Sequence, residues 1–187
     1  MAVMRLDQPR IPALDPDDCS EEAAAVMRPF RDTGRVLNIF RTLGNHPDLA
    51  RRWMVFANHV LAKSTLSARD REIAILRIGW LCKAGYEWGQ HVIIARQAGI
   101  TDEEISNIQA GPDAPEWGEL EALILRATDE LHEDAFVSDT TWNALSHHYS
   151  TEQMMDLVFT VGQYNLVSMA LNSFGVQPDP GLPGWDV

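Results

Sequence analysis

Glu72, Glu87 and His91 are the residues of this chain best suited to chemistry, because they interrupt its most apolar stretch. Glu87 and His91 are four residues apart, so on a helix they share one face. Glu72 lies near the start of the preceding apolar segment, and residues 84–85 (Ala-Gly) offer a turn that would bring the two segments together. Two carboxylates and an imidazole in an apolar pocket are suited to general acid–base catalysis, since burial shifts their pKa values.

In a catalytic interpretation of these three residues, called the trio below, His91 is the general acid or base, Glu87 orients its ring, and Glu72 holds or relays a second proton. Tyr86 could assist by donating its hydroxyl to a developing oxyanion. A tyrosine in such a position more often only packs its ring and makes one hydrogen bond.

Two other interpretations of the trio stay open. Glu87 and His91 could form a surface pair that contributes only ~0.3–0.5 kcal/mol to a helix. Glu72 would then lie in solvent at the first turn of its own helix, where an acid suits the helix dipole. Alternatively, Glu72, Glu87 and His91 could coordinate a divalent metal through carboxylate oxygens and one nitrogen. Because no second histidine shares the motif, we expect no metal and no cofactor.

The composition is that of an ordinary globular protein, with 187 residues of which 45% are hydrophobic and 22% charged. A chain of this length can bury one substantial core, so a single domain is expected. The excess of acidic over basic residues, 27 against 15, gives a net charge of −12. Nucleic acids and anionic membranes require a basic patch, so neither is expected as a partner. We expect a small-molecule substrate instead.

The N-terminal residues carry no apolar segment of signal-peptide length, and no later stretch is long and apolar enough to span a membrane. We therefore expect a cytoplasmic protein. The two cysteines, Cys19 and Cys82, are far apart and belong to no disulfide or metal motif, so both are expected to be reduced thiols. Cys82 could be reactive if the pocket opens onto it, although its apolar neighbours favour a small buried side chain.

Helices must position the trio, because no stretch shows the alternation of a strand. Ser67 to Asp70 has the pattern of an N-terminal cap and opens a helix over residues 71–82, and a second helix is expected over residues 86–98. Caps, early acids and apolar periodicity indicate further helices that begin near residues 20, 47, 101, 117, 138 and 150, and residues 38–44 form a short apolar segment. The predicted fold class is all-α, with about eight helices.

One all-α domain is expected over residues 1–187. Residues 1–18 contain three prolines and are expected to form an extended N-terminal arm. Residues 176–187 are rich in proline and glycine, and we expect this C-terminal tail to be an exposed arm.

The motif region resembles a known family. The runs Leu66–Arg77, Tyr86–His91 and Ala95–Glu104 are similar to the carboxymuconolactone decarboxylase family, whose superfamily also contains the alkylhydroperoxidase D-type proteins. Asn38–Pro47 fits the same pattern, so the resemblance covers residues 36–110 as a family-like core. It implies an alkylhydroperoxidase D-like all-α fold that assembles into homo-oligomers, as trimers or hexamers, with the site near a subunit boundary.

The resemblance also implies which residues do the chemistry. In the peroxidase branch, the site combines a Glu, a Cys-x-x-Cys pair and a downstream His. Alignment on His91 places Glu72 at the proton-relay glutamate, whereas the two cysteine positions fall on Ala84 and Glu87. A dithiol peroxidase cycle needs both thiols, so it is not expected here. The decarboxylase branch, where a lactone acid loses carbon dioxide with proton transfer, fits the remaining Glu and His side chains better.

Three hypotheses for function follow. The leading one is a cofactor-independent lyase or isomerase, carboxy-lyase-like, that acts on a small organic acid or lactone through Glu72, Glu87 and His91. A dianionic substrate would also need arginines, and the motif region offers Arg69, Arg71, Arg77 and Arg96. The first alternative is a thiol peroxidase that uses Cys82. The second is a non-catalytic oligomeric ligand-binding protein, in which the trio is a buried structural network.

Overall fold

The computed structural model describes residues 4–31 and 34–186. Within these residues the chain forms nine α-helices, one π-helical turn and no strand, so the all-α prediction is confirmed. In chain order the elements are α1 (Glu21–Arg31), α2 (Asn38–Leu43), α3 (Pro47–Asn58), the π-helical turn η1 (His59–Lys63), α4 (Ala68–Leu81), α5 (Gly85–Gln97), α6 (Asp102–Ala110), α7 (Glu119–Asp134), α8 (Asp139–Leu145) and α9 (Thr151–Phe174).

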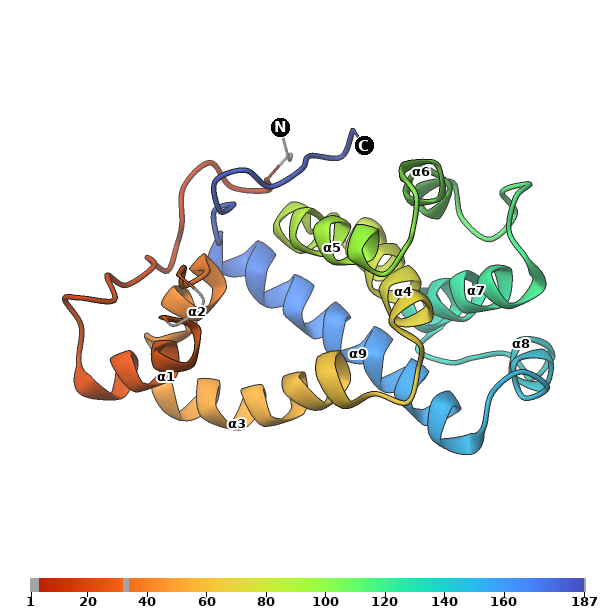
Figure 1. Ribbon diagram of the computed structural model, residues 1–187, viewed down its shortest axis with the longest axis horizontal. Coiled ribbons are helices and arrows are strands. Elements are labelled where there is room, and N and C mark those ends of the chain that lie inside the picture. The colour runs from red at the N-terminus through yellow and green to blue at the C-terminus, as the bar shows by residue number, and fades with distance from the viewer. Residues whose placement is uncertain (1–3, 32–33, 187) are drawn as a thin grey trace.

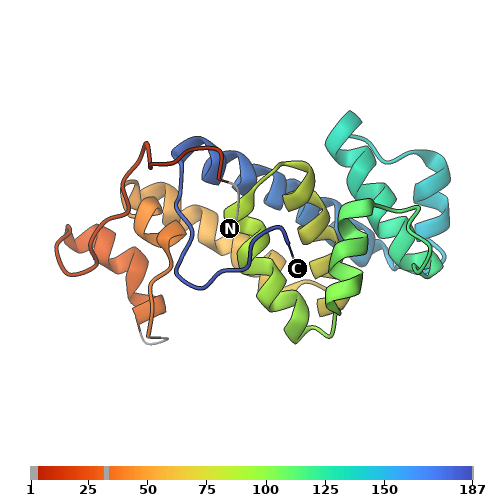
Figure 2. The ribbon, with the colours of Figure 1, turned by 90° about the horizontal axis from the view of Figure 1, so that it is seen from above.

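Helix α4 lies at the centre of the fold and packs against α5, α7 and α9. Every residue from Glu72 to Gly79 is buried, so this stretch has no solvent-facing side. Figure 1 shows α9 crossing the molecule diagonally, with α4 and α5 on one side of it and α3 on the other. In the view from above, α1 lies at one end and α7 and α8 lie at the other (Figure 2).

The turn between α4 and α5 brings the two helices of the trio together. As predicted, Ser67 caps α4, since its hydroxyl accepts the backbone N–H of Asp70 at 3.0 Å. α4 ends at Leu81, and Lys83 then adopts the left-handed region with φ 52°. Gly85 is already the first residue of α5, so the reversal is made slightly earlier in the chain than residues 84–85 suggested.

The C-terminal tail is not an exposed arm, and that prediction was wrong. The ring of Trp185 lies 5.0 Å from that of Trp80 and 5.3 Å from that of Trp88, and the indole N–H of Trp88 donates to the carbonyl of Gly184 at 2.9 Å. Gly89 makes the approach possible, because a Cβ at this position would lie only 2.9 Å from the carbonyl oxygen of Pro183. These aromatic and polar contacts outweigh the preference of a proline-rich segment for solvent.

The N-terminal arm contains no helix between residues 4 and 18. Its backbone is tied to the end of α9, because the N–H groups of Arg10 and Ile11 donate to the carbonyl of Phe174 at 2.8 and 3.1 Å. Among the described residues, no helix is both long enough and apolar enough to cross a membrane.

Candidate active site

The structure brings the trio together in one buried cluster. Nδ1 of His91 lies 2.6 Å from Oε2 of Glu72, and Nε2 of the same ring lies 2.9 Å from Oε1 of Glu87. Glu72 is 0% exposed, Glu87 4% and His91 5%. The alternative of a solvent-exposed pair is therefore excluded by burial.

The imidazole of His91 is positively charged at neutral pH. Both ring nitrogens face carboxylates, so both must donate a proton. Burial alone would lower the pKa of His91, but the charges of Glu72 and Glu87 and their hydrogen bonds raise it to about 10. Arg71 adds a second positive charge, since its Nε lies 3.2 Å from Oε1 of Glu72. Two carboxylates, one imidazolium and one guanidinium cancel in charge, which allows the cluster to be buried.

The same contacts bear on the metal alternative. A metal-binding histidine needs one free ring nitrogen, and His91 has none because each nitrogen already contacts a carboxylate. Within the described parts of the chain, no group of three or more His, Cys, Asp or Glu side chains is arranged to hold a metal ion.

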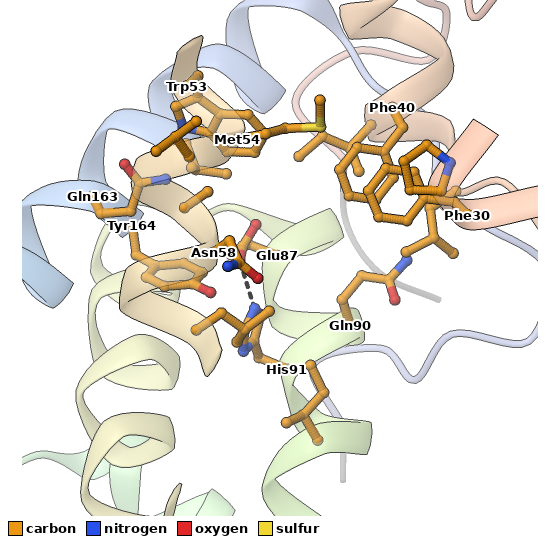
Figure 3. Close-up of a pocket in the computed structure, with 18 of the residues that line it drawn as sticks. Phe30, Phe40, Trp53, Met54, Asn58, Glu87, Gln90, His91, Gln163 and Tyr164 are labelled. Atoms are coloured by element: carbon orange, nitrogen blue, oxygen red, sulfur yellow. Dashed lines mark ion pairs between the residues drawn. The ribbon is translucent and has the colours of Figure 1, made fainter. Parts of the chain in front are cut away.

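A cavity of about 680 Å³ opens next to the trio, and only part of the trio reaches it. Glu87 and His91 line the cavity, whereas Glu72 lies behind His91 and does not. The other walls come from α1, α2, α3 and α9 and are mostly apolar and aromatic, with Phe30, Phe40, Trp53 and Met54 among the lining side chains (Figure 3). A largely apolar cleft with a few convergent polar groups is typical of a small-molecule site.

Sequence reasoning missed Tyr164, a residue of α9 in the same cavity. Its ring stands edge-on to that of His91, with 4.8 Å between the ring centroids, and Figure 3 shows its hydroxyl directed towards Glu87 and His91. Burial, together with the charges of Glu87 and Glu72, raises the pKa of Tyr164 well above its usual value, so its hydroxyl remains a proton donor. The only sequence signal was a Gln-Tyr pair within the apolar run of α9.

Asn58 is a second missed residue, at the C-terminal end of α3. It lines the cavity, and Figure 3 shows its side chain next to Glu87. The π-helical turn η1 begins directly after it, and such turns are frequent at functional sites.

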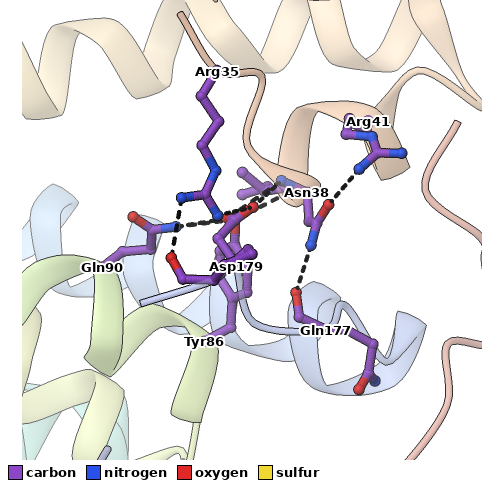
Figure 4. A network of polar contacts seen from close by, with 9 residues as sticks. Arg35, Asn38, Arg41, Tyr86, Gln90, Gln177 and Asp179 are labelled. Atoms are coloured by element: carbon purple, nitrogen blue, oxygen red, sulfur yellow. Dashed lines mark hydrogen bonds and ion pairs between the residues drawn. The ribbon is translucent and has the colours of Figure 1, made fainter. Parts of the chain in front are cut away.

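Tyr86 lies on the same helix as Glu87, but its hydroxyl belongs to a different network. It donates to Oδ2 of the buried Asp179 at 2.6 Å and accepts the backbone N–H of Ile39 at 3.2 Å. Asp179 also accepts the side-chain N–H of Gln90 at 2.9 Å and the backbone N–H of Asn38 at 3.2 Å, and Arg35 lies 3.2 Å from it (Figure 4). Burial and the neighbouring Asp179 raise the pKa of Tyr86. The structure therefore gives this hydroxyl a positioning role between α5 and the C-terminal tail.

Cys82 follows the last residue of α4 and does not line the cavity of the trio. Its thiol donates to Oδ1 of Asn165 at 3.1 Å, and burial raises its pKa. A thiol with a raised pKa is a weak nucleophile at neutral pH, because the thiolate is the reactive form.

The arginines of the motif region are all engaged outside the cavity. Arg69 binds Glu104 at 2.5 Å, Arg77 binds Asp129 at 2.6 Å, and Arg96 binds Asp102 at 2.7 Å. Arg71 is held by Glu72, as described above. None of these four arginines lines the cavity, so none of them is positioned to bind a dianionic substrate there.

Comparison with known sequences identifies the family. The sequence profile of the carboxymuconolactone decarboxylase family matches residues 47–130, which contain the whole trio. Over residues 47–130 the chain is similar to the carboxymuconolactone decarboxylase family, and its fold is that of the alkylhydroperoxidase D-like proteins. The matched segment overlaps the expected core of residues 36–110 and extends into α7. No curated protein is similar enough in sequence to count as a relative.

Solved structures of the superfamily fold are similar over almost the whole chain. A peroxidase-related protein with an alkylhydroperoxidase core from Ralstonia eutropha JMP134 has a TM-score of 0.82 at 17% identity, covering 96% of this chain and 97% of its own. A peroxidase-related protein from Silicibacter sp. TM1040 has a TM-score of 0.80 at 14% identity, covering 96% and 98%. A variant of the debrominase Bmp8, in complex with 2,3,4-tribromopyrrole, has a TM-score of 0.73 at 17% identity, covering 93% and 94%.

Proposed function

We propose that this protein is a cofactor-independent lyase or isomerase that transfers a proton on a small molecule bound in the cavity. The proposal rests on the position of Glu87, which contacts His91 and also lines the cavity. One of its oxygens is held by His91 at 2.9 Å, and the same side chain lines the cavity where a substrate would lie. A carboxylate that is fixed by one neighbour and open to a ligand on its other side is suited to act as a general base.

In this proposal the roles differ from those expected from the sequence. Glu87 removes a proton from the carbon between a carbonyl group and a C=C bond. The electron pair of the broken C–H bond forms a new C=C bond, and the π pair of the carbonyl group moves to its oxygen, which gives a dienolate. Tyr164 donates a hydrogen bond to that oxygen. Protonated Glu87 then returns the proton to the far carbon of the original C=C bond as the carbonyl group re-forms, which completes the isomerisation. His91 stays protonated and orients Glu87, while Glu72 and Arg71 hold the imidazolium in place.

The superfamily and the similar structures support an enzyme without choosing the reaction. Two of the similar proteins are described as peroxidase-related and a third as a debrominase bound to a halogenated pyrrole. The peroxidase alternative is less well supported, because Cys82 lies outside the cavity and its thiol is held by Asn165. The debrominase shows that this fold can bind a small ring-containing molecule, which is what an apolar cavity would accept.

A single domain that forms homo-oligomers is part of the same proposal. Helices α3 and α9 expose several large apolar side chains, namely Val55, Phe159, Leu166 and Met169. Exposed apolar residues of this size support contact with further copies of the chain.

Deuterium exchange tests the proposed proton transfer without a known substrate. The protein is incubated in D₂O with cyclic ketones and unsaturated lactones, and ¹H NMR follows loss of the signal next to the carbonyl group. We expect exchange with wild type, and a rate lower by about 10²-fold or more for Glu87→Gln. Glu103→Gln, an exposed glutamate of α6, is the control and should exchange like wild type. Equal rates for wild type and Glu87→Gln, or no exchange with any compound, would contradict the proposal.

A further inference from the structure

The charges that face the cavity indicate which substrates it can hold. Among the described residues that line it, Glu87 is the one carboxylate, and the cationic side chains are Arg51, Lys63 and His91. His91 is not available to an anion, because both of its nitrogens already contact carboxylates. Arg51 is paired with Asp48. An anionic group near the trio would therefore meet the charge of Glu87 without a free cation beside it.

Lys63 does not change this conclusion. It is an exposed side chain at the end of η1, whereas Glu87 and His91 are buried. An ion pair with an exposed lysine contributes little, typically below about 1 kcal/mol. The expectation of an organic acid as substrate therefore finds no matching group in the buried part of the site.

The walls opposite Glu87 favour rings. Phe30 and Phe40 stack on each other with 3.6 Å between their centroids and 11° between their planes. Figure 3 shows this pair across the cavity from Tyr164, with Trp53 and Met54 above. Aromatic rings and a methionine thioether pack well against flat, polarisable molecules. A cavity of about 680 Å³ falls within the size range of sites for drug-sized ligands.

The carboxylate of Glu87 is the group of the trio that can accept a hydrogen bond from a ligand. Oε1 of Glu87 accepts the N–H of His91 at 2.9 Å, and the same carboxylate lines the cavity. A carboxylate that reaches the cavity can accept an N–H or O–H group of a ligand, and a hydrogen bond to a charged group contributes about 1.5–3 kcal/mol. Such a contact would also place the ligand next to the base.

We propose that the substrate is an uncharged, ring-containing molecule that presents an N–H or O–H to Glu87 and carries no carboxylate. The inference rests on the proposed function, because it concerns the same site and narrows its substrate. Such a substrate has no carboxylate to lose as carbon dioxide, so the inference favours isomerisation of a neutral compound with an N–H or O–H group over decarboxylation.

Three matched ligands test this inference by binding alone. These are 2-naphthol, 2-naphthoate and 2-methoxynaphthalene, which share one ring system. At pH 7 the first is a neutral donor, the second an anion, and the third neutral without a donor. Isothermal titration calorimetry with the full chain should give a Kd for 2-naphthol at least about tenfold lower than for the other two, which corresponds to one hydrogen bond to the carboxylate.

Substitution at Glu87 assigns the preference to the carboxylate. Glu87→Gln should reduce the advantage of 2-naphthol over 2-methoxynaphthalene to below about threefold, whereas Glu103→Gln should retain it. If circular dichroism shows that Glu87→Gln is unfolded, the ranking of the three ligands by wild type decides alone. Tighter or equal binding of 2-naphthoate, or no binding of any of the three at 1 mM, would overturn the inference.

The two proposals can fail separately. A preference for 2-naphthol without any deuterium exchange would retain the ligand class and remove the catalytic role. Exchange that depends on Glu87 but occurs with an anionic compound would retain the proton transfer and remove the ligand class.

Discussion

Oε2 of Glu72 lies 2.6 Å from Nδ1 of His91, although Glu72 does not line the cavity. Glu72 therefore influences the cavity only through His91, by keeping the imidazole charged and fixing its orientation. The residue that faces the cavity is Glu87, on the opposite side of the ring. In the proposed mechanism, this order of three side chains separates a supporting carboxylate from the base.

Glu72→Gln should destabilise the protein strongly. The substitution leaves the buried imidazolium with one carboxylate and removes the partner of Arg71, which should lower the free energy of unfolding by roughly 3 kcal/mol. Urea denaturation at pH 7 measures the loss. Glu103→Gln, at an exposed site, should differ from wild type by less than about 0.5 kcal/mol. A similar small effect for Glu72→Gln would show that the buried charge is not needed.

Stability should fall as the pH rises above the pKa of an unfolded histidine. The pKa of His91 is raised from 6.5 to about 10 in the folded state, so between these values the folded protein binds more protons than the unfolded chain. The free energy of unfolding therefore decreases with pH, by at most about 1.4 kcal/mol per unit. Denaturation between pH 6.5 and about 7.5, below the range where thiols titrate, should show this slope. It should be absent in His91→Gln, and an equal slope in that variant would assign the effect to other groups.

Tyr164 and Tyr86 should respond differently to loss of the hydroxyl. Tyr164→Phe removes the proposed donor to the enolate and should lower the deuterium exchange rate by about 10²-fold with little change in stability. Tyr86→Phe removes one of the hydrogen-bond donors to the buried Asp179 and should lower the free energy of unfolding by about 1–3 kcal/mol. Exchange rates and denaturation curves for both variants check the pair. A larger loss of exchange in Tyr86→Phe than in Tyr164→Phe would reverse the two assignments.

Gly89→Ala should destabilise the protein, contrary to the usual effect of alanine in a helix. A methyl group here would meet the carbonyl oxygen of Pro183 at 2.9 Å, and such overpacking costs about 1–3 kcal/mol. Gly162→Ala in α9 is the matched control, because no atom lies within 4 Å of its Cβ position, and it should stabilise by up to about 1 kcal/mol. Thermal unfolding of both variants should give shifts of opposite sign. Stabilisation by both Gly89→Ala and Gly162→Ala would show that the C-terminal tail does not pack closely against α5 at Gly89.

Cys82 should not form a sulfenic acid readily. Its thiol is partly buried, has a raised pKa and donates to Asn165, so little thiolate is present at pH 7. Dimedone labelling after treatment with hydrogen peroxide, followed by mass spectrometry, should leave Cys82 unmodified. Rapid and complete labelling would restore the thiol peroxidase hypothesis.

Local sequence patterns predicted most of the helices and part of the site. Cap residues such as Ser67, Thr101 and Ser150 mark helix starts because their hydroxyls satisfy the first backbone N–H groups, and all three do so in the structure. The proximity of Glu87 and His91 followed from helical spacing alone. The proximity of Glu72 to His91 required only that α4 and α5 be joined by a short turn, which the sequence also indicated.

Contacts between distant segments could not be predicted in this way. Tyr164 reaches His91 from α9, and Asp179 reaches Tyr86 from the C-terminal tail across 93 residues of sequence. The engagement of both imidazole nitrogens depends on how α4 and α5 are rotated about their axes, which no spacing rule supplies. The tail was misjudged because its prolines and glycines indicate a loop, whereas Trp185 and Asp179 anchor it against α5.

Helix α5 is covered on two sides, by the cavity on one and by the C-terminal tail on the other. All residues from Gly85 to Glu87, as well as Trp88 and Gly89, are buried. A saturation scan of the chain would therefore report intolerance at every one of these positions, whether they take part in chemistry or only in packing. Only isosteric replacements that preserve volume, such as Glu87→Gln, can tell the two causes apart within this segment.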